Sequence, residues 1–268
     1  MSHPLFDLTG RVAIVSGAAQ GMGRAMATAF AECGADLLLT DINESGVQAT
    51  ADQLKKLGRH VVATTYDITD LVQIKAMFAQ LDREFGRIDI LGNVAGPGHL
   101  AKPEEIQLEM VSKILHGLVV ARFACCQEAG RRMLAAGKGS IINIGSIASV
   151  AALGRNNFAY SMGMGGVAMM TRELSTEWAG RGVRVNAILP AQVLNPGLEE
   201  RMRTDPNLEG TFLRGIPVGR LGKPDDIKGL AIFLASDASE FITGALIPMD
   251  GGALAMTSGG TAGPRRQS

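Results

Sequence analysis

The stretch VSGAAQGMGRAMA, residues 15–27, joins a short apolar run to the start of a helical pattern. Glycines stand at positions 17, 21 and 23 of this stretch. Glycines between a strand and a helix let the backbone approach a pyrophosphate, whose negative charge is favoured at a helix N-terminus. The stretch predicts a dinucleotide-binding loop, although a glycine-rich turn also arises for tight packing alone.

The rest of the chain alternates short apolar runs with longer helical patterns. The strand candidates are residues 12–16, 36–40, 60–66, 88–93, 140–145, 183–189 and 245–249. The helix candidates are residues 21–33, 44–57, 70–85, 104–136, 158–180 and 224–235, with Asp70 and Asp225 as expected caps. This alternation predicts βαβ units and a parallel sheet covered on both faces. The tail from residue 253 to 268 is rich in Gly, Ser and Thr, and we expect it to be flexible.

Composition excludes several classes of protein. The 268 residues are 46% hydrophobic, enough for one core, and 26 basic side chains match 26 acidic ones. No basic field therefore exists to attract nucleic acid or an anionic membrane. The three cysteines have neither CxxC nor metal-ligand spacing, so we expect reduced thiols and no metal site. The N-terminus has no apolar signal core, and Arg122 breaks the apolar run GLVVARFACC, which favours a cytoplasmic protein without membrane spans.

An acidic residue closes the second strand candidate. Asp41 follows Gly23 by 18 positions, where a carboxylate can accept hydrogen bonds from both hydroxyls of the adenosine ribose. The same carboxylate would repel a 2′-phosphate, and Ile42 and Asn43 follow it in place of an arginine. The pattern favours NAD over NADP; the alternative is that Asp41 only caps a helix.

Taken together, the motifs resemble those of the short-chain dehydrogenase/reductase family from about Gly10 to Gly252. The matching segments are SGAAQGMG (16–23), YDIT (66–69), NVAG (93–96), INIGS (142–146), GVRVNAILP (182–190), FLASDASEFITG (233–244) and MDGG (249–252). The resemblance implies a Rossmann-type, doubly wound sheet of seven parallel strands in a three-layer α/β/α single domain, here residues 1–252. It also implies a homodimer or homotetramer built through the long helices at 104–136 and 158–180.

The resemblance also implies a set of residues that bind NAD. They are Gly17, Gln20, Gly21, Met22, Gly23, Asp41, Ile42, Asp67, Ile68, Asn93, Ala95, Gly96, Tyr160, Pro190, Val193 and Asn195. Asp67 and Ile68 stand where the family holds adenine. Val193 and Asn195 stand where a threonine is usual near the cofactor amide.

The family transfers a hydride between nicotinamide and a carbonyl or alcohol, with a tyrosine as proton donor or acceptor and a serine that holds the substrate oxygen. Tyr160 and Ser146, fourteen positions apart, match these two roles. The family lysine, four positions after the tyrosine, is Met164 here, and the asparagine of the preceding long helix aligns with Leu118. That lysine binds the nicotinamide ribose and favours the tyrosinate, since a nearby cation typically lowers such a pKa by about one to three units. We therefore expect weak or atypical turnover, with alcohol oxidation affected most.

Two loop residues are candidates to compensate for the missing lysine. His99 and Arg155 belong to loops that usually face the substrate, and the alternative for each is a solvated side chain. The segment 192–215 is expected to cover the site, and its Arg201, Arg203 and Arg214 fit either an acidic substrate or a solvated lid.

Other functional interpretations remain at this point. The main hypothesis is an NAD(H)-dependent oxidoreductase that acts on a small carbonyl or secondary alcohol. The first alternative is a catalytically silent cofactor-binding protein or partner subunit. The second is a non-redox enzyme in which Tyr160 and His99 move protons.

Overall fold

The strands of the molecule form one parallel sheet. Their bounds are β1 (Val12–Ser16), β2 (Asp36–Thr40), β3 (Val61–Thr64), β4 (Ile90–Asn93), β5 (Gly139–Ile144), β6 (Val183–Pro190) and β7 (Leu246–Met249). They are arranged in the order β3-β2-β1-β4-β5-β6-β7, and every pairing is parallel. The chain reverses direction across the sheet between β1 and β4, where an α/β sheet opens a crevice at the carboxyl ends of its strands. The predicted seven-stranded, doubly wound fold is confirmed.

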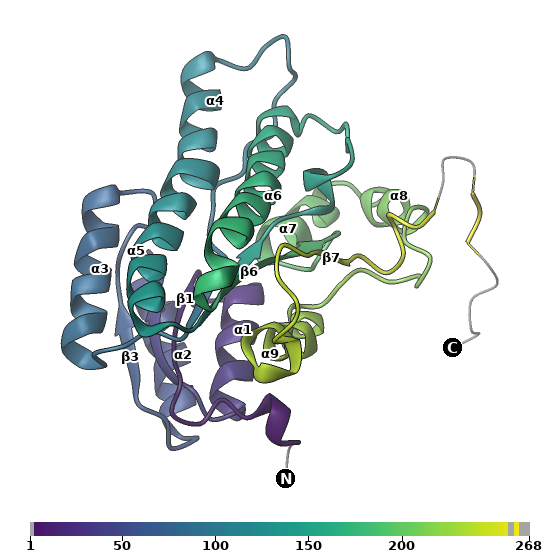
Figure 1. Ribbon diagram of the computed structural model, residues 1–268. Coiled ribbons are helices and arrows are strands. Elements are labelled where there is room, and N and C mark those ends of the chain that lie inside the picture. Colours follow the sequence, from purple (N-terminus) through teal and green to yellow (C-terminus); the bar gives the residue numbers. More distant parts are fainter. Residues whose placement is uncertain (1–2, 257–259, 263–268) are drawn as a thin grey trace.

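Helices cover both faces of this sheet (Figure 1). Their bounds are α1 (Gly21–Glu32), α2 (Glu44–Lys55), α3 (Leu71–Glu84), α4 (Leu108–Leu115), α5 (Ala121–Ala136), α6 (Phe158–Trp178), α7 (Pro196–Thr204), α8 (Leu208–Leu213) and α9 (Lys228–Ala235). One core cluster packs α1, α2 and α9 on one face of the sheet, and a second packs α3, α5 and α6 on the other. The result is the expected three-layer, single-domain arrangement.

The long helix expected over residues 104–136 differs from its prediction. It begins at Leu108, because residues 102–106 form a turn in which the amides of Glu105 and Ile106 donate to the carbonyl of Lys102. Between α4 and α5 a π-helical segment runs from His116 to Val120. A Cβ at Gly117 would lie 2.6 Å from Cγ of Pro97, so the helix passes close to the loop after β4. Such π segments add one residue to a turn and often occur at functional sites.

Of the two expected helix caps, one is confirmed. Asp70 accepts hydrogen bonds from the amides of Val72 and Gln73 at the start of α3. Asp225 is not a cap: it lies in the first turn of the 3₁₀ segment Pro224–Ile227 that precedes α9. Its neighbour Asp226 instead accepts a hydrogen bond from the amide of Lys223.

The computed structural model describes residues 3–256 and 260–262. Most of the tail expected to be flexible, residues 253–268, lies outside the described residues. Within the described ranges, none of the helices combines the length and apolar character needed to cross a membrane.

Candidate active site

The glycine loop lies at the carboxyl end of β1 and leads directly into α1. Gly17 adopts a φ of +69°, a conformation that favours glycine, and Gly21 is the first residue of α1. A Cβ on Gly23 would lie 2.1 Å from the carbonyl oxygen of Gly17, so only glycine lets the helix pack this close to the loop. Gln20 occupies the N-cap position with its side chain free of capping bonds, and the amides of the first turn are directed towards the crevice.

Asp41 follows β2 at the next strand end. Its Oδ2 accepts a hydrogen bond of 3.0 Å from the amide of Ala19, and its Oδ1 accepts one of 3.0 Å from Asn43. Asn43, not Asp41, is the N-cap of α2, so the interpretation of Asp41 as a helix cap is wrong. The carboxylate is therefore fixed beside the glycine loop. Ile42 is 72% exposed beside it.

The predicted residues around β3 and β4 fall into two groups. Oδ1 of Asp67 accepts hydrogen bonds from the amide and hydroxyl of Thr69, and Ile68 is buried beside this turn. Ala95 follows β4 at the crevice. Asn93 is fully buried, and its amide donates to the carbonyl of Arg122 at 3.1 Å and to Oδ1 of Asn143 at 3.2 Å. Asn93 thus ties α5 to β4 and β5 below the crevice.

A cavity of about 650 Å³ opens at the carboxyl ends of β4, β5 and β6. The predicted residues that line it are Met22, Gly96, His99, Ser146, Arg155, Tyr160, Met164, Pro190, Val193, Asn195 and Arg201. The remaining residues predicted to bind a cofactor lie outside this lining, at the ends of β1, β2, β3 and β4. The glycine loop and the cavity therefore lie at the same edge of the sheet.

Ser146 and Tyr160 reach the cavity from different elements. Ser146 follows β5, is 7% exposed, and its Oγ accepts a hydrogen bond of 3.1 Å from the amide of Ala148. Its own amide donates to Oγ of Ser149 at 3.2 Å, so both the side chain and the backbone of the serine are held in place. Tyr160 lies in the first turn of α6 and lines the same cavity.

The two positions that the sequence analysis aligned with the family lysine and asparagine are apolar and packed together. Met164 is 2% exposed and Leu118 is fully buried, and both belong to one cluster against which Tyr160 packs. A Cβ at Gly163 would lie 2.7 Å from Cδ1 of Leu118, so the leucine fills the space between the π segment and α6. Neither side chain can donate a strong hydrogen bond.

Asn195 and Val193 follow β6 at the far side of the cavity. Oδ1 of Asn195 accepts a hydrogen bond of 3.0 Å from the amide of Leu198 and so caps α7. Val193 is buried and forms a bridge with Gly222. Pro190 ends β6 and lines the cavity.

The charged groups in the cavity lining are all basic. Arg122, Arg155 and Arg201 line it together with His99 and Tyr160, and no Asp or Glu of the described part of the chain does. Burial lowers the pKa of Arg155, and the charge of Arg201 lowers it further. Arg155 also has a φ of +58°, which is strained for a side chain of this size, and its guanidinium stacks on Phe212 at 5.0 Å from the ring centre.

Sequence reasoning missed Arg122. It treated the arginine only as a break in an apolar run, although an arginine surrounded by GLVVA and FACC has to be buried by the helix that contains it. The structure places this guanidinium in the floor of the cavity, where it is 2% exposed.

The residues of the crevice fit a dinucleotide. The cradle at Gly17 and Gly23 would be filled by any Cβ, the N-terminus of α1 faces the crevice, and the Asp41 carboxylate is fixed at the end of β2. These are the groups that a pyrophosphate and a ribose require.

Comparisons with known proteins agree with this geometry. Residues 17–253 match a family profile described as enoyl-(acyl carrier protein) reductase. The chain is 42% identical to a D-threitol dehydrogenase of Mycolicibacterium smegmatis over 92% of this chain and 94% of the relative. It is 37% identical to a 2-dehydro-3-deoxy-D-gluconate 5-dehydrogenase of Bacillus subtilis over 93% and 97% of the two chains. The solved gluconate 5-dehydrogenase of Burkholderia cenocepacia, in complex with NADP and tartrate, matches with a TM-score of 0.88 at 29% identity, over 94% and 98%.

Proposed function

Because this chain belongs to the short-chain dehydrogenase/reductase family, we propose that it is an NAD(H)-dependent oxidoreductase that interconverts a small carbonyl compound and a secondary alcohol. The observation that supports this reaction most strongly is the meeting of Ser146 and Tyr160 in one cavity that continues the nucleotide crevice. Bound NAD(H) would accept or supply the hydride. The protein has to hold the substrate oxygen and move one proton.

Each of the two polar side chains has one role in this proposal. The hydroxyl of Ser146 donates a hydrogen bond to the substrate oxygen, because its amide partner at Ala148 leaves the hydroxyl proton free for that purpose. The hydroxyl of Tyr160 gives its proton to the carbonyl oxygen during reduction, and the phenolate takes the alcohol proton during oxidation. Met164 cannot favour that phenolate, so the site is atypical and better suited to reduction at neutral pH.

Asp41 supports NAD rather than NADP in this proposal. The carboxylate is fixed between Ala19 and Asn43 at the end of β2, where a 2′-phosphate would meet its charge. Ile42, the next residue, is apolar and supplies no cation to offset that repulsion. A similar solved structure contains NADP, so our preference for NAD rests on Asp41 and Ile42 alone.

The charge of the cavity narrows the substrate class. Three arginines and no carboxylate line it, which favours a polyhydroxylated substrate with an anionic group. Relatives named for threitol and for 2-dehydro-3-deoxy-D-gluconate act on substrates of these two kinds, neutral and acidic. We expect an aldonate or its keto acid to be a better substrate than the matching neutral polyol.

Exposed apolar side chains support the proposal of a homo-oligomer, and the thiols support the proposal of a cytoplasmic location. Several large apolar side chains of α4, α5, α6 and the π segment are exposed, which fits a second copy of the chain packed against these helices: Leu108, Val120, Phe123, Met162 and Met169. We expect a homodimer or homotetramer by light scattering. Burial raises the pKa of Cys126 to about 12, and the free thiols fit a reducing cytoplasm.

The experiment that tests the proposed function follows nicotinamide absorbance at 340 nm across a panel of keto acids, aldonates and polyols. Wild-type protein should oxidise NADH with one of the carbonyl compounds, Tyr160→Phe should stop the change, and Met164→Lys should raise alcohol oxidation about tenfold or more. Thr176→Lys adds the same charge at an exposed position of α6, outside the apolar set above, and should leave the rate unchanged. A flat signal for wild type and Met164→Lys would favour a silent partner subunit or a non-redox enzyme.

A further inference from the structure

The guanidinium of Arg122 is a buried charge without an acidic partner in the described chain. It is 2% exposed, and no Asp or Glu lines the cavity that it faces. An isolated buried charge costs several kcal/mol unless nearby groups compensate for it, so such a residue is rarely kept for packing alone.

Three backbone carbonyls hold the guanidinium in place. Its Nε donates to Ala95 at 3.1 Å, its Nη2 donates to Val94 at 2.9 Å, and its Nη1 donates to Ile144. These carbonyls end β4 and β5, so the positive charge is fixed at the carboxyl edge of the sheet. Each of the three nitrogens donates one N–H to a backbone carbonyl. Two of the five N–H groups of the guanidinium therefore take no part in these three hydrogen bonds.

The position of the charge depends on its neighbours in the helix and in the loop. Arg122 follows the π segment and lies four residues after Leu118, on the same side of the helix. A Cβ at Gly96 would lie 2.8 Å from Nη2 of Arg122, so the glycine leaves the guanidinium close to the cavity floor. The apolar pair Leu118 and Met164 keeps hydrogen-bonding groups away from this side of the phenol.

Among the described residues, the charged groups that line the cavity together with Tyr160 are basic. Arg122 approaches from α5, His99 from the loop after β4, Arg155 from the loop before α6, and Arg201 from α7. Of these, only Arg122 is fully buried, and a charge out of water is screened least. We therefore expect the charge of Arg122 to be screened less than the charges of the three exposed groups.

We propose that Arg122 is a positioning residue that supplies, from α5, the positive charge that favours the Tyr160 phenolate in place of a lysine at position 164. This inference rests on the proposed function of Tyr160. Since the structure shows no hydrogen bond between the two side chains, the charge acts through space and more weakly than a lysine in contact would.

The electrostatics of Arg122 agree with this role. Burial lowers its pKa, while the charge of Tyr160 acts in the opposite direction, followed by smaller effects of Cys126 and Cys125. Because arginine side chains are not deprotonated in proteins, we expect Arg122 to stay positive at neutral pH in spite of its burial.

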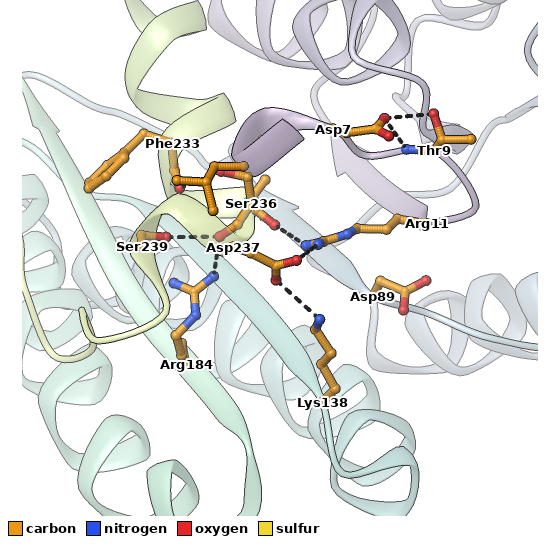
Figure 2. Close-up of polar contacts among 12 residues, drawn as sticks. Asp7, Thr9, Arg11, Asp89, Lys138, Arg184, Phe233, Ser236, Asp237 and Ser239 are labelled. Atoms are coloured by element: carbon orange, nitrogen blue, oxygen red, sulfur yellow. Dashed lines mark hydrogen bonds and ion pairs between the residues drawn. The ribbon is translucent and has the colours of Figure 1, made fainter. Parts of the chain in front are cut away.

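A comparison within the molecule separates this role from packing. Arg184, at the amino edge of the sheet, also donates to backbone carbonyls, at 2.8 Å to Leu234 and 3.2 Å to Ser236 (Figure 2). Acidic groups at Asp237 and Glu240 act on Arg184, whereas none acts on Arg122. Replacing Arg184 therefore removes a half-buried guanidinium and its carbonyl contacts, and we expect no change in the field at Tyr160.

The chain offers a direct optical test, because it contains only two tyrosines, Tyr66 and Tyr160. In a Tyr66→Phe background, tyrosinate absorbance at 295 nm reports Tyr160 alone, without cofactor or substrate. Arg122→Met and Arg122→Gln should move the midpoint of its appearance to higher pH by about one unit or more, because a neutral side chain no longer favours the phenolate. Arg122→Lys should move it less, and Arg122→Met with Met164→Lys should move it back.

Arg184→Met is the matched control and should leave the midpoint unchanged. The proposal is overturned if folded Arg122→Gln, checked by circular dichroism, titrates like its parent, or if Arg184→Met shifts the midpoint equally. If Arg122→Met does not fold, Arg122→Gln and Arg122→Lys decide, because both retain a donor for the carbonyls. A shifted midpoint together with flat 340 nm absorbance would support this inference while contradicting the proposed function.

Discussion

The two edges of the sheet contain cavities of similar size and opposite electrostatic design. The cavity at the amino edge, about 580 Å³, is lined by Arg11, Lys138 and Arg184 together with Asp89, Asp237 and Glu240. The cavity at the carboxyl edge, about 650 Å³, is lined by three arginines and no acid. Figure 2 shows Asp237 between Arg11 and Lys138, at 2.6 Å and 3.1 Å from their nitrogens.

Basic side chains serve two different purposes at the two edges of this sheet. At the amino edge each cation has an acid nearby, so the charges neutralise one another and contribute to stability. At the carboxyl edge the cations lack acids, so their field is available to anions: a phenolate, a phosphate or a carboxylate. Both edges contain basic side chains. The edge that we propose to be functional differs because its basic side chains have no acidic neighbours among the described residues of the cavity.

The largest predicted effect is a loss of NADH affinity at the carboxyl edge. In Gly23→Ala the new Cβ would lie 2.1 Å from the carbonyl oxygen of Gly17, so the loop has to open. We expect NADH affinity to fall by about 100-fold or more, equivalent to roughly 2.8 kcal/mol. Titration calorimetry with NADH measures it. Gly229→Ala on α9, where a Cβ meets nothing within 4 Å, is the control, and an equal loss there would contradict the assignment.

An intermediate effect is expected on substrate preference when one basic side chain of the carboxyl-edge cavity is removed. Arg201→Met removes one cavity charge, so the preference for an aldonate over its neutral alditol, measured as a ratio of kcat/KM, should fall by about tenfold. Arg203→Met is the matched control, because Arg203 lies on the same helix but pairs with Glu200 outside the cavity. The substrate assignment fails if both variants change the ratio alike.

The smallest effect belongs to the amino edge. Hydrogen bonding from Lys138 and the charge of Arg11 outweigh the opposing effect of burial and lower the pKa of Asp237 from 3.8. A lowered pKa gives stability that is present above pH 3.8 and is lost as the pH falls through the folded-state value. Because Asp237 is 44% exposed, Asp237→Asn should lower the free energy of unfolding by only about 1 kcal/mol at pH 7.

Urea denaturation at pH 7 and near pH 3 measures the contribution of Asp237 to the free energy of unfolding. The gap between wild type and Asp237→Asn should shrink at the lower pH, while the tyrosinate midpoint stays the same in both proteins. A gap that persists at low pH, or a shifted midpoint, would show that the two edges are not independent.

Most of the fold could be predicted because local patterns determine it. The strand runs, the glycine loop and the Asp70 cap depend on residues close in sequence, and these predictions were confirmed. The late start of the long helix and its π segment were not predicted, and the close approach of Gly117 to Pro97, twenty residues earlier, is a contact that local patterns do not encode. Arg122 was missed for the same reason: its three carbonyl partners come from the ends of β4 and β5.

In the candidate site, too, the residues with a local sequence motif could be predicted, and those defined by distant contacts could not. Motif spacing was sufficient to select Ser146 and Tyr160, which the structure brings to one cavity. Spacing also indicated the loss of a lysine at Met164, but it could not show where a replacement charge would come from. His99 and Arg155, the two candidates chosen from their loops, do line the cavity, yet both are exposed.

The most direct test of the central claim is transfer of deuterium from NADH labelled at the nicotinamide C4 position to the product alcohol, followed by mass spectrometry. With wild-type protein the label should appear on the carbinol carbon of a polyhydroxylated product, and with Tyr160→Phe no label should appear although NADH binding is retained. It is contradicted if NADH binds and no product of the panel gains label, or if Tyr160→Phe transfers label as fast as wild type.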